Sequence, residues 1–576
     1  MLINKLNRVL FSDDSDSFKT PNHFWLGASL LFAFLYSSIS LYQAFDGLYV
    51  VRDDARQHVF WMRRFLDPEL FPDDLIADYF QSIAPLGYKT IYAIPAFFQI
   101  DPLVISKILP AILMAIAVYY TFVLSTELLP IPFTGFISAL LITQNIWKQD
   151  SLVSGTPKAF AIPLLTAFLY YFIKKSILGT NISLILCGLF YPSLVFICSG
   201  LLLIHFFPFK FRLIDFEPKQ DNILCISGLV TAFLVLLPYA ITSSQYAPTI
   251  TAEAARSLPD FGIDGRSSFF NDREPWDFWF NGSRSGIRIT SALIPALAYV
   301  GILLPFIVSF RKLFPLTKKI SAKINVLPQL VIVSLVMFFT AHLLLFRLHL
   351  PSRYTENPLR IAVILSAAIS ITIILQYLLD QAIVFYSRNT LIANIVAIVP
   401  ITLIVLSLCF YPYSIKRLNS AKYQQGDAIA LYEFLQQQPK DIVVASLVPE
   451  ADNLPTFAQR SILVSSEYAI PYHTGYYFPF RQRVIDLINA QYDSNLLALK
   501  RFIRQYRISF FLLESGIFTP EYIQNNSWIW QHQPAAQNAV DHLNQGNAPA
   551  LKAYEAKCSV LKTDRYNLMA TKCILN

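Results

Sequence analysis

The chain has 576 residues, of which 55% are hydrophobic and 15% are charged, and its mean hydropathy is +0.46. Soluble proteins have about 25% charged residues, so this composition excludes an ordinary soluble enzyme and indicates a membrane protein with many spans. The net charge of +8 does not indicate nucleic-acid binding, because its clearest concentration lies between two apolar spans. This basic loop contains Arg311, Lys312, Lys318, Lys319 and Lys323, and such a loop is typical of the cytoplasmic side.

The first apolar span, residues 24–42, contains no charged residue. A helix needs roughly 20 apolar residues to cross a bilayer core, so this span is long enough. It is too long for the apolar region of a signal peptide and lacks a convincing small-residue cleavage site. We therefore predict a transmembrane helix and no cleavable signal peptide.

A polar loop, residues 43–84, follows the first span and contains eight carboxylates and four arginines. Two of the carboxylates, Asp53 and Asp54, are adjacent and lie about ten residues past the span. The apolar pattern of VFWMRRFL predicts a helix on the membrane surface. A second pair, Asp73 and Asp74, is predicted to cap a helix that starts near Leu75. A carboxylate pair just outside a membrane suggests chemistry on a membrane-held substrate.

Ten further apolar spans bring the predicted number of crossings to eleven. They cover residues 85–100, 103–128, 132–147, 159–173, 180–206, 222–242, 289–310, 328–349, 360–379 and 390–410. The region 85–206 has two open arrangements, because span 85–100 contains Lys89 and two prolines. In the first arrangement this span crosses. In the second it is re-entrant, and span 180–206 splits into two crossings at Tyr191-Pro192.

The basic loop also sets the orientation. If it is cytoplasmic, the amino terminus with Lys5, Arg8 and Lys19 is cytoplasmic too. The loops 43–84 and 243–288, the connection RLHLPSRYTENPLR and the tail are then extracytoplasmic. We therefore divide the chain into a transmembrane module, residues 1–414, and a small extracytoplasmic α/β domain, residues 415–576.

Alternation of helices and short apolar strands in the tail predicts a layered domain with a largely parallel sheet. Cys558 and Cys573 both lie in this tail and could form a disulfide that closes a hairpin. The predicted helices are 427–437 and 496–508, and the predicted strands are 441–448, 460–466 and 509–515.

This layout resembles the GT-C superfamily of integral-membrane glycosyltransferases. Members have an acidic residue or pair in the first extracytoplasmic loop, then amphipathic surface helices, and often a carboxy-terminal extracytoplasmic domain. The matching stretches are YVVRDDARQHVFWMRRFLDPELFPDD, TGFISALLITQNIWKQDSLVSGTPKAFAIPLLTAFLYYFIKK, LPSRYTENPLR and ALKRFIRQYRISFFLLES. The resemblance implies a polyprenyl-phosphate sugar as donor and an extracytoplasmic acceptor.

Transfer of a sugar to a hydroxyl or amide needs a carboxylate near the acceptor as general base. Asp54 is our first choice for this base and Asp53 our second. Adjacent carboxylates repel each other, which is expected to raise one of the two pKa values. The structural alternative is that Arg52 and Arg56 only form ion pairs with these aspartates.

Arginines on outer loops could bind the donor phosphate, because the planar guanidinium suits phosphate oxygens. Arg353 and Arg360, with Tyr354 between them, lie at the predicted mouth between two spans, and Arg56 is a further candidate. The alternative for Arg353, Arg360 and Tyr354 is membrane anchoring at the interface.

His58 lies four residues after Asp54, on the same face of a helix. It could orient a carboxylate or bind a metal ion, or it could be structural. Asp150 would join the site only in the second arrangement. No cofactor is required by the sequence, although Asp53 and Asp54 could bind a divalent metal ion.

We therefore predict a membrane glycosyltransferase in a bacterial inner membrane, with the bilayer, a polyprenyl-phosphate sugar and an unidentified acceptor as partners. The alternative is a non-catalytic transporter, flippase or assembly factor for lipid-linked sugars. A transporter is expected to have charges at mid-bilayer depth. The charged residues in the predicted spans, Lys89, Lys107, Glu127 and Arg347, instead lie near span ends.

Overall fold

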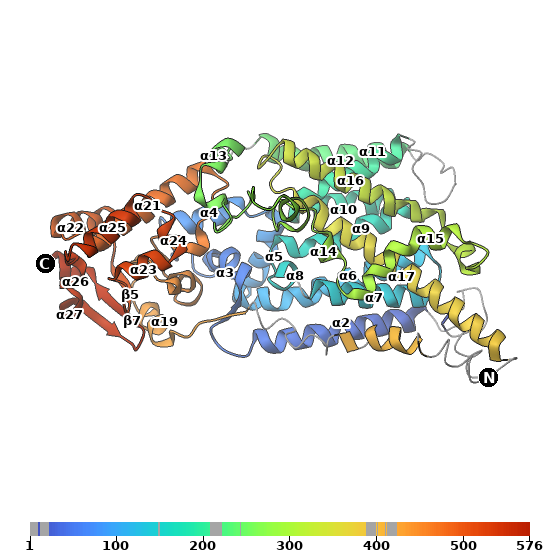
Figure 1. Cartoon of the computed structure of the whole chain (residues 1–576), viewed down its shortest axis with the longest axis horizontal. Coiled ribbons are helices and arrows are strands. Elements are labelled where there is room, and N and C mark those ends of the chain that lie inside the picture. Colours follow the sequence, from blue (N-terminus) through green and yellow to red (C-terminus); the bar gives the residue numbers. More distant parts are fainter. Residues whose placement is uncertain are drawn as a thin grey trace.

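The computed structural model describes residues 10–11, 22–147, 150–207, 222–241, 244–386, 399, 401–408, 410–411 and 423–576. Long helices fill one end of the molecule and a five-stranded sheet lies at the other end (Figure 1). Some features named above lie outside the described residues. These are the cations Lys5, Arg8 and Lys19, most of span 390–410 and the side chain of Asp150.

Five helices are long and apolar enough to cross a membrane, by length and composition. Some of their apolar side chains are exposed, such as Phe34 at 64%, which is expected where a helix faces lipid. The chain is therefore an integral membrane protein. The five helices are α2 (Asn22–Ala44), α6 (Pro102–Leu128), α12 (Asn222–Ile241), α16 (Val326–Leu343) with the turn Ala322–Asn325 before it, and α17 (Ser352–Tyr386).

Shorter apolar helices complete the helical part. α6 packs against α2, against α7 (Pro132–Ile146) and against α9 (Ala161–Ile173). The predicted span 180–206 consists of two helices, α10 (Ile177–Phe190) and α11 (Ser193–Phe206), because Pro192 interrupts the backbone hydrogen-bond pattern.

α5 (Leu86–Phe97) has only 12 residues and contains Pro95, so it is too short to cross a bilayer core. The division of span 180–206 at Tyr191-Pro192 matches the second predicted arrangement, whose crossings stay a prediction.

Two predictions of local structure were wrong. The predicted span 289–310 consists of the short helix α14 (Ile289–Ala292) and, after Pro295, an apolar helix over Ala296–Ser309 made of η5 (Ala296–Leu303) and α15 (Leu304–Ser309), since Pro295 interrupts a continuous helix. The segment VFWMRRFL is not a surface helix. Its η1 turn (Phe60–Phe65) buries three apolar side chains inside the protein, namely those of Phe60, Trp61 and Met62.

The predicted cap was confirmed. The Asp74 carboxylate accepts hydrogen bonds from the backbone N–H groups of Ile76 and Ala77, at 2.8 and 3.0 Å. These bonds satisfy two donors at the start of α4 (Leu75–Ile83), as expected for an aspartate at this position. Asp74 therefore has a structural role.

The five-stranded sheet of the tail has the order β4-β3-β5-β7-β6. β3 pairs in parallel with β4 and β5, whereas β7 pairs antiparallel with β5 and β6. The prediction of a largely parallel sheet was therefore wrong at one edge, where the chain returns as a hairpin. The strands are β3 (Val443–Ala445), β4 (Ser461–Ile462), β5 (Phe510–Glu514), β6 (Ser559–Lys562) and β7 (Tyr566–Ala570).

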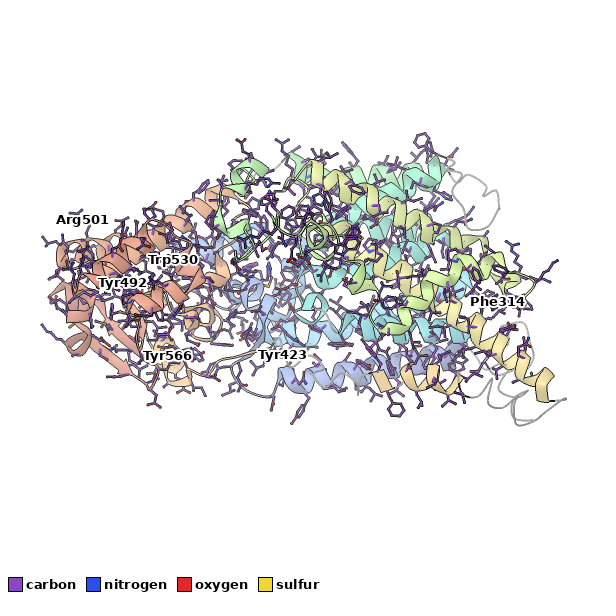
Figure 2. All side chains as sticks on the ribbon, viewed as in Figure 1. Phe314, Tyr423, Tyr492, Arg501, Trp530 and Tyr566 are labelled. Atoms are coloured by element: carbon purple, nitrogen blue, oxygen red, sulfur yellow. A yellow bond between two sulfur atoms is a disulfide. The ribbon has the colours of Figure 1, made fainter. Side chains whose placement is uncertain are left out.

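A separate two-stranded ladder joins the first loop to the start of the tail. β1 (Val50–Arg52) pairs antiparallel with β2 (Tyr423–Gln425). The Arg52 guanidinium lies 3.7 Å from the centre of the Tyr423 ring, and the Tyr423 hydroxyl donates to the backbone oxygen of Ser40 at 2.9 Å. Tyr423 thus lies at the junction of the helical part and the tail (Figure 2). The ladder fixes the residue immediately before Asp53.

Cys558 and Cys573 form a disulfide across a sequence separation of 15 residues, and the β6–β7 hairpin lies between them. A disulfide that closes a loop of this length adds about 3 kcal/mol to the free energy of unfolding.

The C558S/C573S variant is therefore expected to show a lower apparent melting temperature than the wild type in detergent. Reductant should lower the wild-type value and leave the variant unchanged. Equal values for both proteins would contradict a stabilising disulfide.

Candidate active site

The two adjacent aspartates begin α3 (Asp53–Val59), directly after β1. Neighbouring positions on a helix do not face each other, so the two carboxylates have different surroundings. Asp53 forms an ion pair with Arg56, with 2.9 Å between Oδ1 and Nη2, and accepts a hydrogen bond from Gln424 at 3.4 Å. Asp53 therefore forms the ion pair with Arg56 that was the structural alternative to a catalytic role.

The Asp54 carboxylate is different, because no described side chain forms a hydrogen bond or an ion pair with it, and the residue keeps part of its surface accessible. Burial raises its pKa, but four neighbouring groups outweigh burial and hold the pKa below the ordinary 3.8. These groups are Lys158, His58, Arg353 and Arg266. The expectation that repulsion from Asp53 raises one of the two pKa values was therefore wrong for Asp54, because the surrounding positive charge dominates.

The cations around Asp54 come from distant parts of the chain. Lys158 lies in the η2 turn (Pro157–Phe160), and Arg353 lies in the first turn of α17. Arg266 lies in the second large loop, where its backbone oxygen accepts a hydrogen bond from Arg284 Nη2 at 3.1 Å. Arg353 and Arg284 both act electrostatically on Lys158. We call Lys158, Arg266, Arg284 and Arg353 the cation cluster.

The histidines of the site are neutral near pH 7. Burial lowers the pKa of His58 to about 4, although the charge of Asp54 raises it. Burial and the nearby cations lower the pKa of His349 to about 3. His58 and Asp54 act on each other's pKa, as expected for side chains on one face of α3. Near pH 7 neither histidine adds positive charge to the site, and His58 lowers the pKa of Asp54 only at the acidic pH where His58 is itself protonated.

Glu356 lies in α17, three residues after Arg353, and three arginines surround its carboxylate. Its carboxylate lies 3.4 Å from Arg360 Nη2, 3.7 Å from Arg353 Nη1 and 4.0 Å from Arg288 Nη2. The Arg360 side chain is completely buried and also donates to Asn357. One carboxylate therefore serves three guanidinium groups, which leaves this region positively charged.

Three residues predicted to bind substrate are held by protein contacts. Arg56 donates to Asp53, to Asn453 and to the tail residue Glu467. Tyr354 is buried, and its hydroxyl donates to the backbone oxygen of Leu348. Arg360 is buried as described above. Of the predicted substrate-binding residues, Arg353 and His58 act electrostatically on Asp54.

Glu467 connects three distant segments and was not identified from the sequence. It accepts from Arg266 of the second loop at 2.6 Å and from Arg56 of α3 at 3.2 Å. Its backbone oxygen accepts from Gln57. Its segment carries no motif, so only the folded chain reveals this role. Lys158 and His349 lie in stretches named in the sequence analysis, and Arg284 lies in the second large loop, but none of the three was identified from the sequence either.

Comparison with known proteins identifies the fold of this chain. No protein family matches the sequence, and no curated protein matches it. The structure resembles archaeal oligosaccharyltransferase AglB from Archaeoglobus fulgidus in complex with an inhibitory peptide and a dolichol-phosphate. The TM-score is 0.50 at 12% identity, over 89% of this chain and 72% of that one. The chain has the GT-C fold.

The A. fulgidus oligosaccharyltransferase in complex with Zn and sulfate gives the same TM-score of 0.50 and 12% identity, over 89% of this chain and 70% of that one. The predicted GT-C architecture is thus confirmed as a fold. At 12% identity the similarity does not transfer residue roles, so the site has to be interpreted from its own geometry.

Burial raises the pKa of Glu467 to about 7, although Arg266 and Arg56 lower it. The folded protein therefore binds this proton more tightly than the unfolded chain, whose glutamate has an ordinary pKa of 4.5. The associated stabilisation is complete below pH 4.5 and is lost as the pH rises toward 7. It amounts to about 3 kcal/mol over this window.

The wild type is accordingly expected to lose stability relative to E467Q between pH 5 and 8, because glutamine stays neutral. Apparent melting temperatures in detergent would measure this difference. E433Q, at an exposed position of α19 (Ile429–Gln436), serves as the matched control and should follow the wild type. Parallel pH profiles for wild type and E467Q would contradict the prediction.

Proposed function

We propose that this protein is a membrane glycosyltransferase that moves a sugar from a polyprenyl-phosphate donor to an extracytoplasmic acceptor. The observation that carries the proposal is the unpaired Asp54 carboxylate within the cation cluster. One group can accept a proton, and the other groups can stabilise a leaving phosphate. The similarity in fold to an oligosaccharyltransferase whose structure contains a dolichol-phosphate supports a lipid-linked donor.

In the proposed reaction, an oxygen or nitrogen of the acceptor attacks the anomeric carbon of the donor sugar. The bond between this carbon and the phosphate oxygen breaks, and the lipid phosphate leaves with the electron pair. Asp54 takes the proton of the acceptor as general base. The cation cluster stabilises the charge on the leaving phosphate.

The low pKa of Asp54 fits this sequence of events. Without a bound donor, the cation cluster makes Asp54 a weak base. A bound donor phosphate offsets part of this positive charge, so the pKa of Asp54 rises when the donor is present. The base would then become stronger only when a sugar is available for transfer.

The remaining predicted site residues have different proposed roles. Arg353 contacts the donor phosphate, and neutral His58 orients Asp54. Asp53 is the weaker candidate for the base, because Arg56 and Gln424 already occupy its carboxylate. Arg56, Tyr354 and Arg360 support the site without touching the substrate.

We further propose that the tail is extracytoplasmic and the amino terminus cytoplasmic, with eleven crossings, in a bacterial inner membrane. Phe314, in the basic loop, and Tyr492, in the tail, lie at opposite ends of the molecule (Figure 2). Since basic loops stay in the cytoplasm, this arrangement supports a tail on the outer side. The site then faces outward, where the tail meets the helices.

Transfer of sugar from a panel of labelled polyprenyl-phosphate sugars by the purified protein tests the proposal. The D54N variant is expected to lose at least about 100-fold in rate, because general bases contribute about that much or more. D53N is expected to lose less, since it removes only a partner of Arg56. D564N, at an exposed position of the tail, is the matched control with an unchanged rate.

Two other results of this experiment would change the proposal. Equal rates for D54N and wild type would remove Asp54 from the mechanism and keep the enzyme. Lipid-phosphate binding without transfer from any donor would replace the transferase by the transporter or assembly-factor alternative.

A further inference from the structure

The donor set around Asp54 does not fit a divalent metal ion. Hard cations such as Mg²⁺ and Mn²⁺ take about six ligands, mainly oxygens, and Zn²⁺ takes about four. Among the described residues of the site, the metal-ligating side chains that no ion pair holds are those of Asp54, His58 and His349, because Asp53 is bound to Arg56. Across the described residues, no three His, Cys, Asp or Glu side chains are grouped to hold a metal ion.

The charge of the site also disfavours a metal ion. Arg266 is paired with Glu467, which leaves five cations facing two carboxylates, Asp54 and Glu356. A dication would add to this excess, whereas a phosphate would offset it. The five cations are Lys158, Arg284, Arg288, Arg353 and Arg360.

Two groups of the site have unused hydrogen-bonding capacity. Within the described part of the chain, Lys158 forms no ion pair, and the buried Nε of Arg353 has no hydrogen-bond partner. Lysine and arginine side chains are the usual protein ligands of phosphate, as a point charge and as a planar fork respectively. The unused donors and the excess charge point to the same kind of ligand.

On the basis of the proposed function, we infer that Lys158, Arg284 and Arg353 bind the donor phosphate directly, in the place that a divalent metal ion takes in other phosphate sites. These three side chains come from the η2 turn, the second large loop and α17. They would surround the phosphate from separate elements. Asp54 is then an anion beside the phosphate and not a metal ligand.

Binding of phosphate by D54N distinguishes direct binding by the cations from binding through a metal ion. If a metal ion joined Asp54 to the phosphate, removal of the carboxylate would weaken phosphate binding. If the cations bind the phosphate directly, removal of the Asp54 charge removes a repulsion. D54N should then bind at least as tightly as the wild type, although it cannot transfer sugar.

The test measures binding of farnesyl phosphate to the purified full-length protein in nanodiscs, by calorimetry, with EDTA or with added Mn²⁺. We expect equal affinity in both conditions for the wild type. K158M should bind about tenfold more weakly or worse, because one charge-assisted contact is worth that much. K312M, in the basic loop, is the matched control and should bind as the wild type does.

Farnesol and inorganic phosphate separate the lipid tail from the phosphate group. Farnesol should show no dependence on Lys158, and inorganic phosphate should compete with farnesyl phosphate. Melting temperatures close to the wild-type value establish that K158M and D54N are folded. If K158M does not fold, K158R and D54N still test the inference, because K158R should keep the affinity and D54N should not lower it.

Binding that EDTA abolishes and Mn²⁺ restores would overturn the inference, as would loss of binding in D54N with full binding in K158M. Sugar transfer that requires added Mn²⁺ would also overturn it and would leave the proposed transferase intact. Metal-independent binding without transfer from any donor would keep the phosphate site and remove the proposed transferase.

Discussion

The acidic segment of this protein depends on contacts with residues far along the chain. β1 is held by β2 at the start of the tail, and Arg56 of α3 is held by Glu467 within the tail. Gln57 adds a hydrogen bond to the backbone of Glu467. These contacts fix the position of α3 between the helices and the tail. They orient the two aspartates so that one is neutralised and the other is available.

The site is built at a cost to stability. Positive side chains that lack carboxylate partners repel each other in partly buried surroundings, and burial of unpaired charge is unfavourable. Three arginines share Glu356, and Lys158 has Arg353 and Arg284 as neighbours. Such an arrangement is common where function opposes stability. Under the proposed function, the opposing demand is a site prepared for an anionic group.

Local patterns made much of the fold predictable. Long uncharged runs predicted the membrane helices, and Asp74 before Leu75 predicted a helix cap, because both depend on residues close in sequence. The hairpin edge of the sheet and the break near Pro295 were missed. The acidic pair and Arg353 were found from the sequence. Lys158, Arg284 and Glu467 were not, because only folding brings Lys158 near Arg353 and Arg284, and Glu467 to Arg56 and Arg266. The low pKa of Asp54 likewise depends on cations that folding brings to it.

The β1–β2 ladder also has a consequence for synthesis. Its strands are about 371 residues apart, as are Asp53 and its partner Gln424. At a translation rate of about 5–20 residues per second, β2 leaves the ribosome roughly 20 to 75 seconds after β1. During that interval the first helices are already in the membrane while α3 lacks its partners. A ribosome-bound chain therefore cannot yet hold its acidic segment in the folded position, and synthesis of the tail sets the moment at which the site is assembled.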